Sequence, residues 1–138
     1  MKKFILAITL LFALLLCSCD KTVYHWELQQ DESKIAEIYI VDANGPRKYA
    51  VIKEISLDKK KELVSEICSL KYQKYGFNLH NTSGLCFVII FENQEYDIIS
   101  YKEPMHVLIE NGEKSALISW LECDYDEFSA LIEKYLQD

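Results

Sequence analysis

The chain has 138 residues, half of them hydrophobic, and a formal net charge of -7 at pH 7. A chain of this length supplies one hydrophobic core and needs no second. An acidic chain also lacks the surplus of Lys and Arg that draws proteins to nucleic acid or to anionic lipid headgroups. The longest basic run, Lys59-Lys60-Lys61, lies at the start of a predicted helix and is typical of a solvated helix face. Composition therefore argues against a nucleic-acid partner.

The first residues have the layout of a signal peptide, because Lys2 and Lys3 precede an apolar run from Phe4 to Leu16. A membrane-spanning helix needs about 20 apolar residues. The run covers only residues 4–16 and is too short to span comfortably. It predicts export followed by removal of the leader.

The leader ends in Leu16-Cys17-Ser18-Cys19, with an aliphatic residue three positions before the second cysteine and a small residue just before it. This segment resembles the lipobox of bacterial lipoproteins, although a cysteine in the middle of the box is less usual than Ala, Ser or Thr. The resemblance implies that residues 1–18 are removed and that Cys19 carries two or three acyl chains. Such chains anchor a protein to a membrane surface without crossing it. The alternative is an ordinary secretory signal cut nearby.

The resemblance also sets the expected organisation of the mature chain. Loss of two lysines and no acids changes the net charge from -7 to -9. Residues 19–33 are expected to form a lipidated N-terminus and tether on the extracytoplasmic side of the cell membrane, and residues 34–138 a single domain. Within the tether, Tyr24, Trp26 and Leu28 fall on one side of an extended chain. These side chains either rest at the membrane interface or dock on the domain, and their alternation favours docking.

A hairpin and a helix are predicted next. Two β-rich runs, about 35–42 and 48–55, flank Asn44-Gly45-Pro46, and Asn-Gly between such runs is a strong hairpin signal. An amphipathic helix follows and ends near Leu70, with Ser56 or Asp58 as its N-cap.

The middle of the chain contains one strand that is apolar on both faces. Residues 71–84 lack helical periodicity and read as an irregular loop, or as an edge strand at 71–75 followed by a shorter loop. The run LCFVIIF at 85–91 predicts a strand buried front and back. Each of its faces therefore needs a cover, from this chain or from a partner.

The last third predicts further strands and a helix. The strand-like runs EYDIISY, MHVLIE and KSALISWLE are separated by Pro104 and by an Asn111-Gly112 turn. Asp124 and Glu127 then form the start of a helix with a capping-box spacing. The element order predicts an α+β fold, with a mainly antiparallel sheet of about five to six strands and two helices packed on one face.

No constellation of residues with catalytic or metal-binding spacing is recognisable. His25, His80 and His106 form no His-x-x-His pair, and the cysteines form no Cys-x-x-Cys pair. We therefore expect no enzyme activity, no cofactor and no metal. A Cys123–His106 nucleophile pair assembled in space is the one alternative that the sequence leaves open.

After lipidation of Cys19, three thiols remain, at Cys68, Cys86 and Cys123. At most one intramolecular disulfide is then available. Cys68 and Cys86 fall in apolar patterns, where an unpaired cysteine behaves as a small hydrophobe. Buried thiols are favoured over a bridge.

The segment 71–84 presents Tyr72, Tyr75, Phe77 and His80, aromatic residues of the kind enriched at interfaces. We expect a membrane-anchored, non-catalytic lipoprotein domain that binds a protein or peptide partner there, as inhibitor, immunity-type or envelope accessory proteins do. Two alternatives remain: these aromatics cover the core, or the domain is a small-ligand or sensory module.

Overall fold

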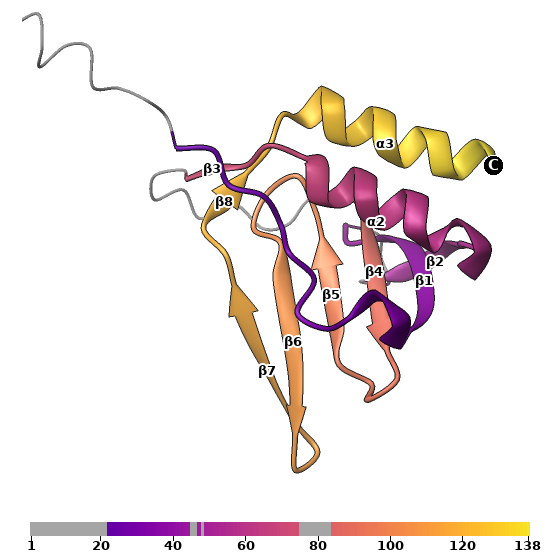
Figure 1. Cartoon of the computed structure of the whole chain (residues 1–138), viewed down its shortest axis with the longest axis vertical. Helices are drawn as coiled ribbons and strands as arrows, with labels where there is room; N and C mark the ends of the chain where they lie inside the picture. The colour runs from indigo at the N-terminus through magenta and orange to yellow at the C-terminus, as the bar shows by residue number, and fades with distance from the viewer. Residues whose placement is uncertain (1–21, 45–46, 48, 75–83) are drawn as a thin grey trace, which may run out of the picture.

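The structure, a computed structural model, describes residues 22–44, 47, 49–74 and 84–138. Its main element is a six-stranded antiparallel sheet in the order β2-β1-β4-β5-β6-β7 (Figure 1). The strands are β1 (Ile35–Asp42), β2 (Ala50–Glu54), β4 (Leu85–Phe91), β5 (Tyr96–Ile99), β6 (Met105–Glu110) and β7 (Glu113–Ile118). The predicted α+β class and antiparallel sheet are confirmed.

The predicted Asn111-Gly112 turn joins β6 to β7. Both residues have positive φ, 52° and 81°. Two-residue hairpin turns of the primed types require this conformation, which Gly adopts freely and Asn tolerates. The turn fixes the register, with Glu110 opposite Glu113.

A second, small sheet lies at one end of the main one. It pairs β3 (Gln73–Lys74) with β8 (Leu121–Glu122). The edge-strand interpretation of 71–75 is therefore the one that the structure shows, although the strand has only two residues and belongs to this separate sheet.

Two helices follow the predicted positions. Helix α2 (Lys60–Ser69) is preceded by a 3-10 turn, η2 (Leu57–Lys59), so Ser56 begins that turn and Lys59 is the N-cap of the α-helix. Neither Ser56 nor Asp58 caps the helix itself, because the tighter turn comes first. Helix α3 (Tyr125–Gln137) begins as predicted, with the Asp124 carboxylate accepting a hydrogen bond from the Glu127 N–H at 2.9 Å.

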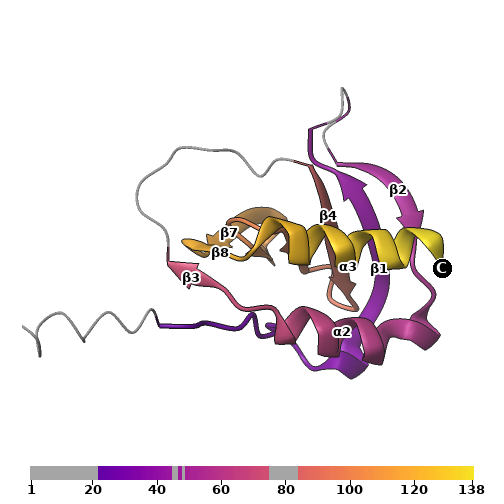
Figure 2. The same ribbon diagram turned by 90° about the horizontal axis from the view of Figure 1, so that it is seen from above.

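Both helices pack on one face of the sheet, where alternate residues of β1 and β4 meet them (Figure 2). Phe87 of β4 lies at the centre, with its ring edge-on to Phe128 at 6.1 Å and to Tyr135 at 6.0 Å between centroids. This layer contains Ile38, Ile40, Leu63, Ile67, Phe87, Ile89, Phe91, Ile99, Phe128, Ile132 and Tyr135. Each fully buried side chain of this size contributes about 1.5–3 kcal/mol.

The N-terminal segment crosses the same face of the sheet, beside α2, before the 3-10 turn η1 (Glu32–Lys34) leads into β1 (Figure 1). Tyr24 and Tyr72 exchange backbone hydrogen bonds, each 2.8 Å long. Trp26 is buried in the core, and Leu28 packs against it. The docking alternative is therefore the one observed, and the part of the expected tether from Tyr24 onward belongs to the domain.

No helix of the described residues is long and apolar enough to cross a membrane.

Cys68, Cys86 and Cys123 are free thiols, with Cys86 and Cys123 buried and Cys68 half-buried. The preference for buried thiols over a bridge is confirmed for Cys86 and Cys123.

Candidate binding site on the open sheet face

The aromatic surface predicted on 71–84 is not assembled by the residues that the structure describes. Tyr72 is fully buried, and its hydroxyl donates a hydrogen bond to the Ser100 carbonyl at 3.0 Å. It is a core residue and its side chain is closed to a partner, because pairing with Tyr24 draws the segment inward. Tyr75, Phe77 and His80 lie outside the described residues, as does Cys19.

The open face of the sheet, opposite the helices, is apolar. Val41, Ile98 and Val107 are almost completely buried there, with 3%, 5% and 6% exposure. Cys86 joins this layer, in which Val41 and Ile98 pack together. No helix of the described chain packs on this side, so these side chains are shielded from solvent by one another.

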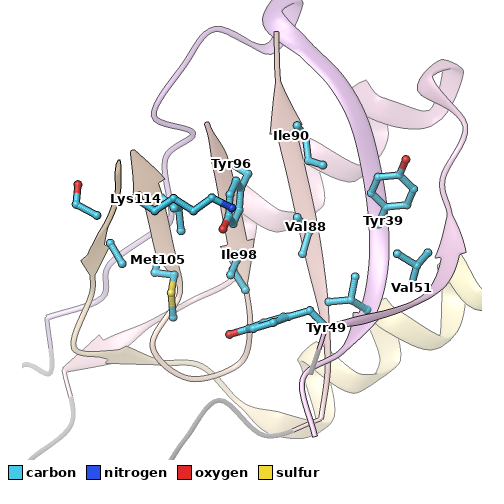
Figure 3. Close-up of a pocket in the computed structure, with 13 residues that line it drawn as sticks. Tyr39, Tyr49, Val51, Val88, Ile90, Tyr96, Ile98, Met105 and Lys114 are labelled. Carbon is cyan, nitrogen blue, oxygen red and sulfur yellow. The ribbon is translucent and has the colours of Figure 1, made fainter. Parts of the chain in front are cut away.

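This face is hollowed into a cavity of about 450 Å³ that is open to solvent (Figure 3). Its walls come from all six strands and from the residue before β2. The lining residues are Tyr39, Val41, Tyr49, Val51, Val88, Ile90, Tyr96, Ile98, Met105, Val107, Lys114, Ser115 and Ala116. We refer to this cavity as the open-face hollow.

Lys114 is the only charged side chain among the lining residues. It extends from β7 over the ring of Tyr96, with its Nζ 5.5 Å from the ring centroid (Figure 3). It forms no ion pair with any residue that the structure describes. An apolar floor with one cation at its edge is an arrangement suited to a ligand that has an apolar body and an anionic group.

The helix face of the same strands holds a buried polar cluster. Asp97 and His106 are opposite each other in the β5–β6 ladder and are hydrogen-bonded through Oδ1 and Nδ1. The Trp26 indole N–H donates to the other Asp97 oxygen at 3.3 Å. Glu95 lies 3.5 Å from His106 Nε2 and accepts a hydrogen bond from Gln30 at 2.7 Å. The cluster thus fastens the N-terminal segment to the sheet.

The acid-base groups of this cluster are enclosed. Asp97 has no exposed surface and His106 has 3%. Burial raises the pKa of Asp97, and the hydrogen bonds from His106 and Trp26 oppose that rise. Groups that are buried and bonded to one another in this way hold a structure together and are closed to a substrate.

The structure places Cys123 and His106 in different surroundings. Cys123 lies in the buried apolar cluster that also contains Tyr72, whereas His106 pairs with Asp97. Burial raises the pKa of Cys123 to about 12, so the thiol is protonated at neutral pH, while a nucleophilic cysteine needs the thiolate. These contacts do not support the Cys123–His106 nucleophile pair.

Sequence reasoning predicted an uncovered apolar face and placed its candidate binding residues on 71–84, where Tyr72, the one of them that the structure describes, is buried. Most of the lining residues occur at alternate positions of their strands, such as Val88 and Ile90 in β4, a strand that is apolar on both sides. That pattern predicts which side chains share the open face. It does not single out Lys114, because lysine is common in edge strands.

Comparison with known proteins identifies no relative: no protein-family model, curated protein or solved structure matches the chain. The class of this protein therefore rests on its fold and surface, those of a small α+β domain with one open, apolar sheet face.

Proposed function

We propose that the protein is a bacterial lipoprotein anchored through Cys19 on the extracytoplasmic side of a cell membrane, where its domain acts by binding and not by catalysis. The anchor is supported by the leader and by Leu16-Cys17-Ser18-Cys19. Binding is supported by one observation above the others: the face of the sheet opposite the helices is apolar and hollowed. Soluble proteins rarely leave large apolar patches uncovered unless the patches bind something.

A protein or peptide partner is the first candidate occupant of this face. Edge strand β7 is exposed along its whole length, and Ile118, which pairs with Met105 of the open face, is 49% exposed. Natural proteins guard such edges with charge, Pro or bulges because other strands add to them. β7 has charges only in its first two residues, Glu113 and Lys114. The uncharged remainder of β7, residues 115–118, favours contact with another chain.

A small ligand is the second candidate, and the open-face hollow favours it. Sites for small molecules occupy about 300–1,000 Å³ and combine apolar walls with few polar groups. The hollow, of about 450 Å³ with Lys114 as its one charged side chain, has these properties.

The anchor is tested with Cys19→Ala in full-length protein produced in a bacterium. Cells that process lipoproteins should retain the wild type in the membrane fraction and release the variant or accumulate it with its leader attached. If the variant loses its leader and still remains in the membrane fraction as the wild type does, the lipoprotein proposal is wrong.

The binding face is tested by incorporating a photoreactive benzophenone side chain at Val51, which lines the hollow and is 59% exposed. The matched control places the same group at Lys61, which is exposed on α2. Irradiation of intact cells should give a defined crosslinked species from position 51 and none from position 61. Identical products from both positions would show that the open face is not the binding surface.

A further inference from the structure

The open-face hollow is long in one direction and narrow in the other. Each of the four central strands contributes two alternate residues: Tyr39 and Val41, Val88 and Ile90, Tyr96 and Ile98, Met105 and Val107. Strands lie about 4.8 Å apart, so six of them span roughly 24 Å, whereas two alternate residues along a strand cover roughly 7 Å. The hollow is therefore a trough that crosses the strands from β2 to β7.

A polypeptide fits this trough poorly. An extended peptide lying across the strands would press its N–H and C=O groups against apolar side chains, and each unsatisfied group costs about 1–3 kcal/mol. A helix satisfies its own backbone, but its diameter with side chains is about 10–12 Å, greater than the roughly 7 Å that separates the two rows of lining residues. A hydrocarbon chain has neither problem, because it is thin and has no polar groups along its length.

The two ends of the trough differ in chemistry. Tyr49 and Val51 line the trough near β2, and Lys114 stands at β7 with its Nζ over the Tyr96 ring. Since none of the residues lining the trough is acidic, the ammonium group of Lys114 favours an anion at that end.

We propose that the trough binds a single-chain amphiphile with an anionic head, a long-chain carboxylate, with its tail across the strands and its carboxylate at Lys114. This inference rests on the proposed role of the open face as a binding surface and specifies the small-ligand candidate. The tail would cover the apolar floor formed by Val88 and Ile98, and the carboxylate would give Lys114 the ion pair that the described residues do not provide. Charge-assisted contacts of this kind orient a ligand whose affinity comes mainly from apolar burial.

The experiment uses membranes isolated from cells that produce the full-length protein, so that the probe is not incorporated into lipid by metabolism. Three photoactivatable probes share one alkyl chain bearing a diazirine and an alkyne, and differ in their heads: carboxylate, alcohol and trimethylammonium. After irradiation, the protein is purified under denaturing conditions and its labelled peptides are mapped by mass spectrometry.

The carboxylate probe should label peptides from β4 to β6 several-fold more than the other two probes, and excess laurate should compete with it. Lys114→Glu should lower carboxylate labelling roughly tenfold, the effect of losing about 1.4 kcal/mol of binding free energy, and raise labelling by the trimethylammonium probe. The matched control, Lys61→Glu, makes the same charge change on α2 and should alter nothing. Lys114 is exposed on an edge strand, and urea unfolding of both variants checks that the fold is intact.

Equal labelling by the three heads, labelling outside the trough, or labelling unaffected by Lys114→Glu would each overturn the inference. These failures are distinguishable from failure of the proposed function. If the photoreactive group at Val51 captures a protein while the carboxylate probe does not label the trough, the open face is a protein-binding surface and the amphiphile is excluded. If neither experiment gives a product, the open face is not a binding surface for either occupant.

Discussion

His106 and Asp97 form a buried imidazole–carboxylate pair directly across the β5–β6 ladder, on the helix face of the sheet. The second oxygen of Asp97 accepts the indole N–H of Trp26, so a residue of the N-terminal segment completes the site. All three side chains are buried, with at most 7% exposure. The pair therefore links the position of the N-terminal segment to the stability of the sheet.

Asp97→Ala should destabilise the protein by about 3–5 kcal/mol, because removal of one partner leaves the imidazole and the indole N–H buried without an acceptor. Urea unfolding followed by tryptophan fluorescence measures this loss. The control is Glu92→Ala, which breaks the exposed Lys34–Glu92 ion pair and should cost about 1 kcal/mol or less. Similar losses for the two variants would contradict a structural role for the buried pair.

Trp26→Phe should loosen the N-terminal segment selectively. The change keeps an aromatic ring in the core but removes the donor to Asp97, which costs about 1–2 kcal/mol. Hydrogen exchange should become faster at Tyr24, whose N–H bonds to the Tyr72 carbonyl, while β4 stays protected. Val23→Ala, at a neighbouring exposed position, is the control and should leave exchange unchanged. Uniform acceleration throughout the sheet would show instead that the segment and the sheet unfold as one unit.

The sequence predicts the local features of this fold well and its long-range contacts poorly. The Asn111-Gly112 turn, the Asp124 cap and the two-faced strand at 85–91 depend on neighbouring residues, and each is found where expected. Tyr72 joins the core because it pairs with Tyr24, a residue 48 positions earlier (72 minus 24). No local pattern encodes that pairing.

The candidate site illustrates the same limit. Apolar residues on both sides of 85–91 predict that a second face needs a cover, but periodicity does not say which elements cover which side. The N-terminal segment and both helices gather on one face, and no described helix covers the other. The position of Lys114 at the rim of the hollow follows from the strand order, in which β7 is the edge strand next to β6.

Neighbouring residues of β4 should respond differently to truncation, because they face opposite layers. Phe87 has no exposed surface and touches Phe128 and Tyr135, so Phe87→Ala should cost about 3–5 kcal/mol. Val88 is half-buried in the open-face hollow, so Val88→Ala should cost about 1 kcal/mol. Denaturant midpoints of the two variants compare these costs. Equal losses would indicate that the open face is covered as fully as the helix face.

The buried thiols should make the protein sensitive to alkali. Burial raises the pKa of Cys86 and of Cys123 from the ordinary value of 9.0 to about 12. Well below pH 9.0 both thiols are protonated in the folded and unfolded states, so they add no pH dependence. Between pH 9.0 and about 12 the unfolded chain releases these protons and the folded chain retains them. The unfolded state is thereby favoured, and stability falls as pH rises, by about 1.4 kcal/mol per pH unit for each thiol.

Cys86→Ala separates this effect from other alkaline titrations, including that of Tyr72, whose pKa burial also raises. The variant has a smaller side chain in the open-face layer, so its stability at pH 8 should be lower than that of the wild type. Its decline between pH 9 and 11 should nevertheless be shallower, by about 1.4 kcal/mol per pH unit, because one titrating thiol is gone. Urea unfolding across this pH range, in reducing buffer, gives both slopes. Parallel slopes would mean that Cys86 ionises equally in the folded and unfolded chains, and that the open-face layer admits water to its sulfur.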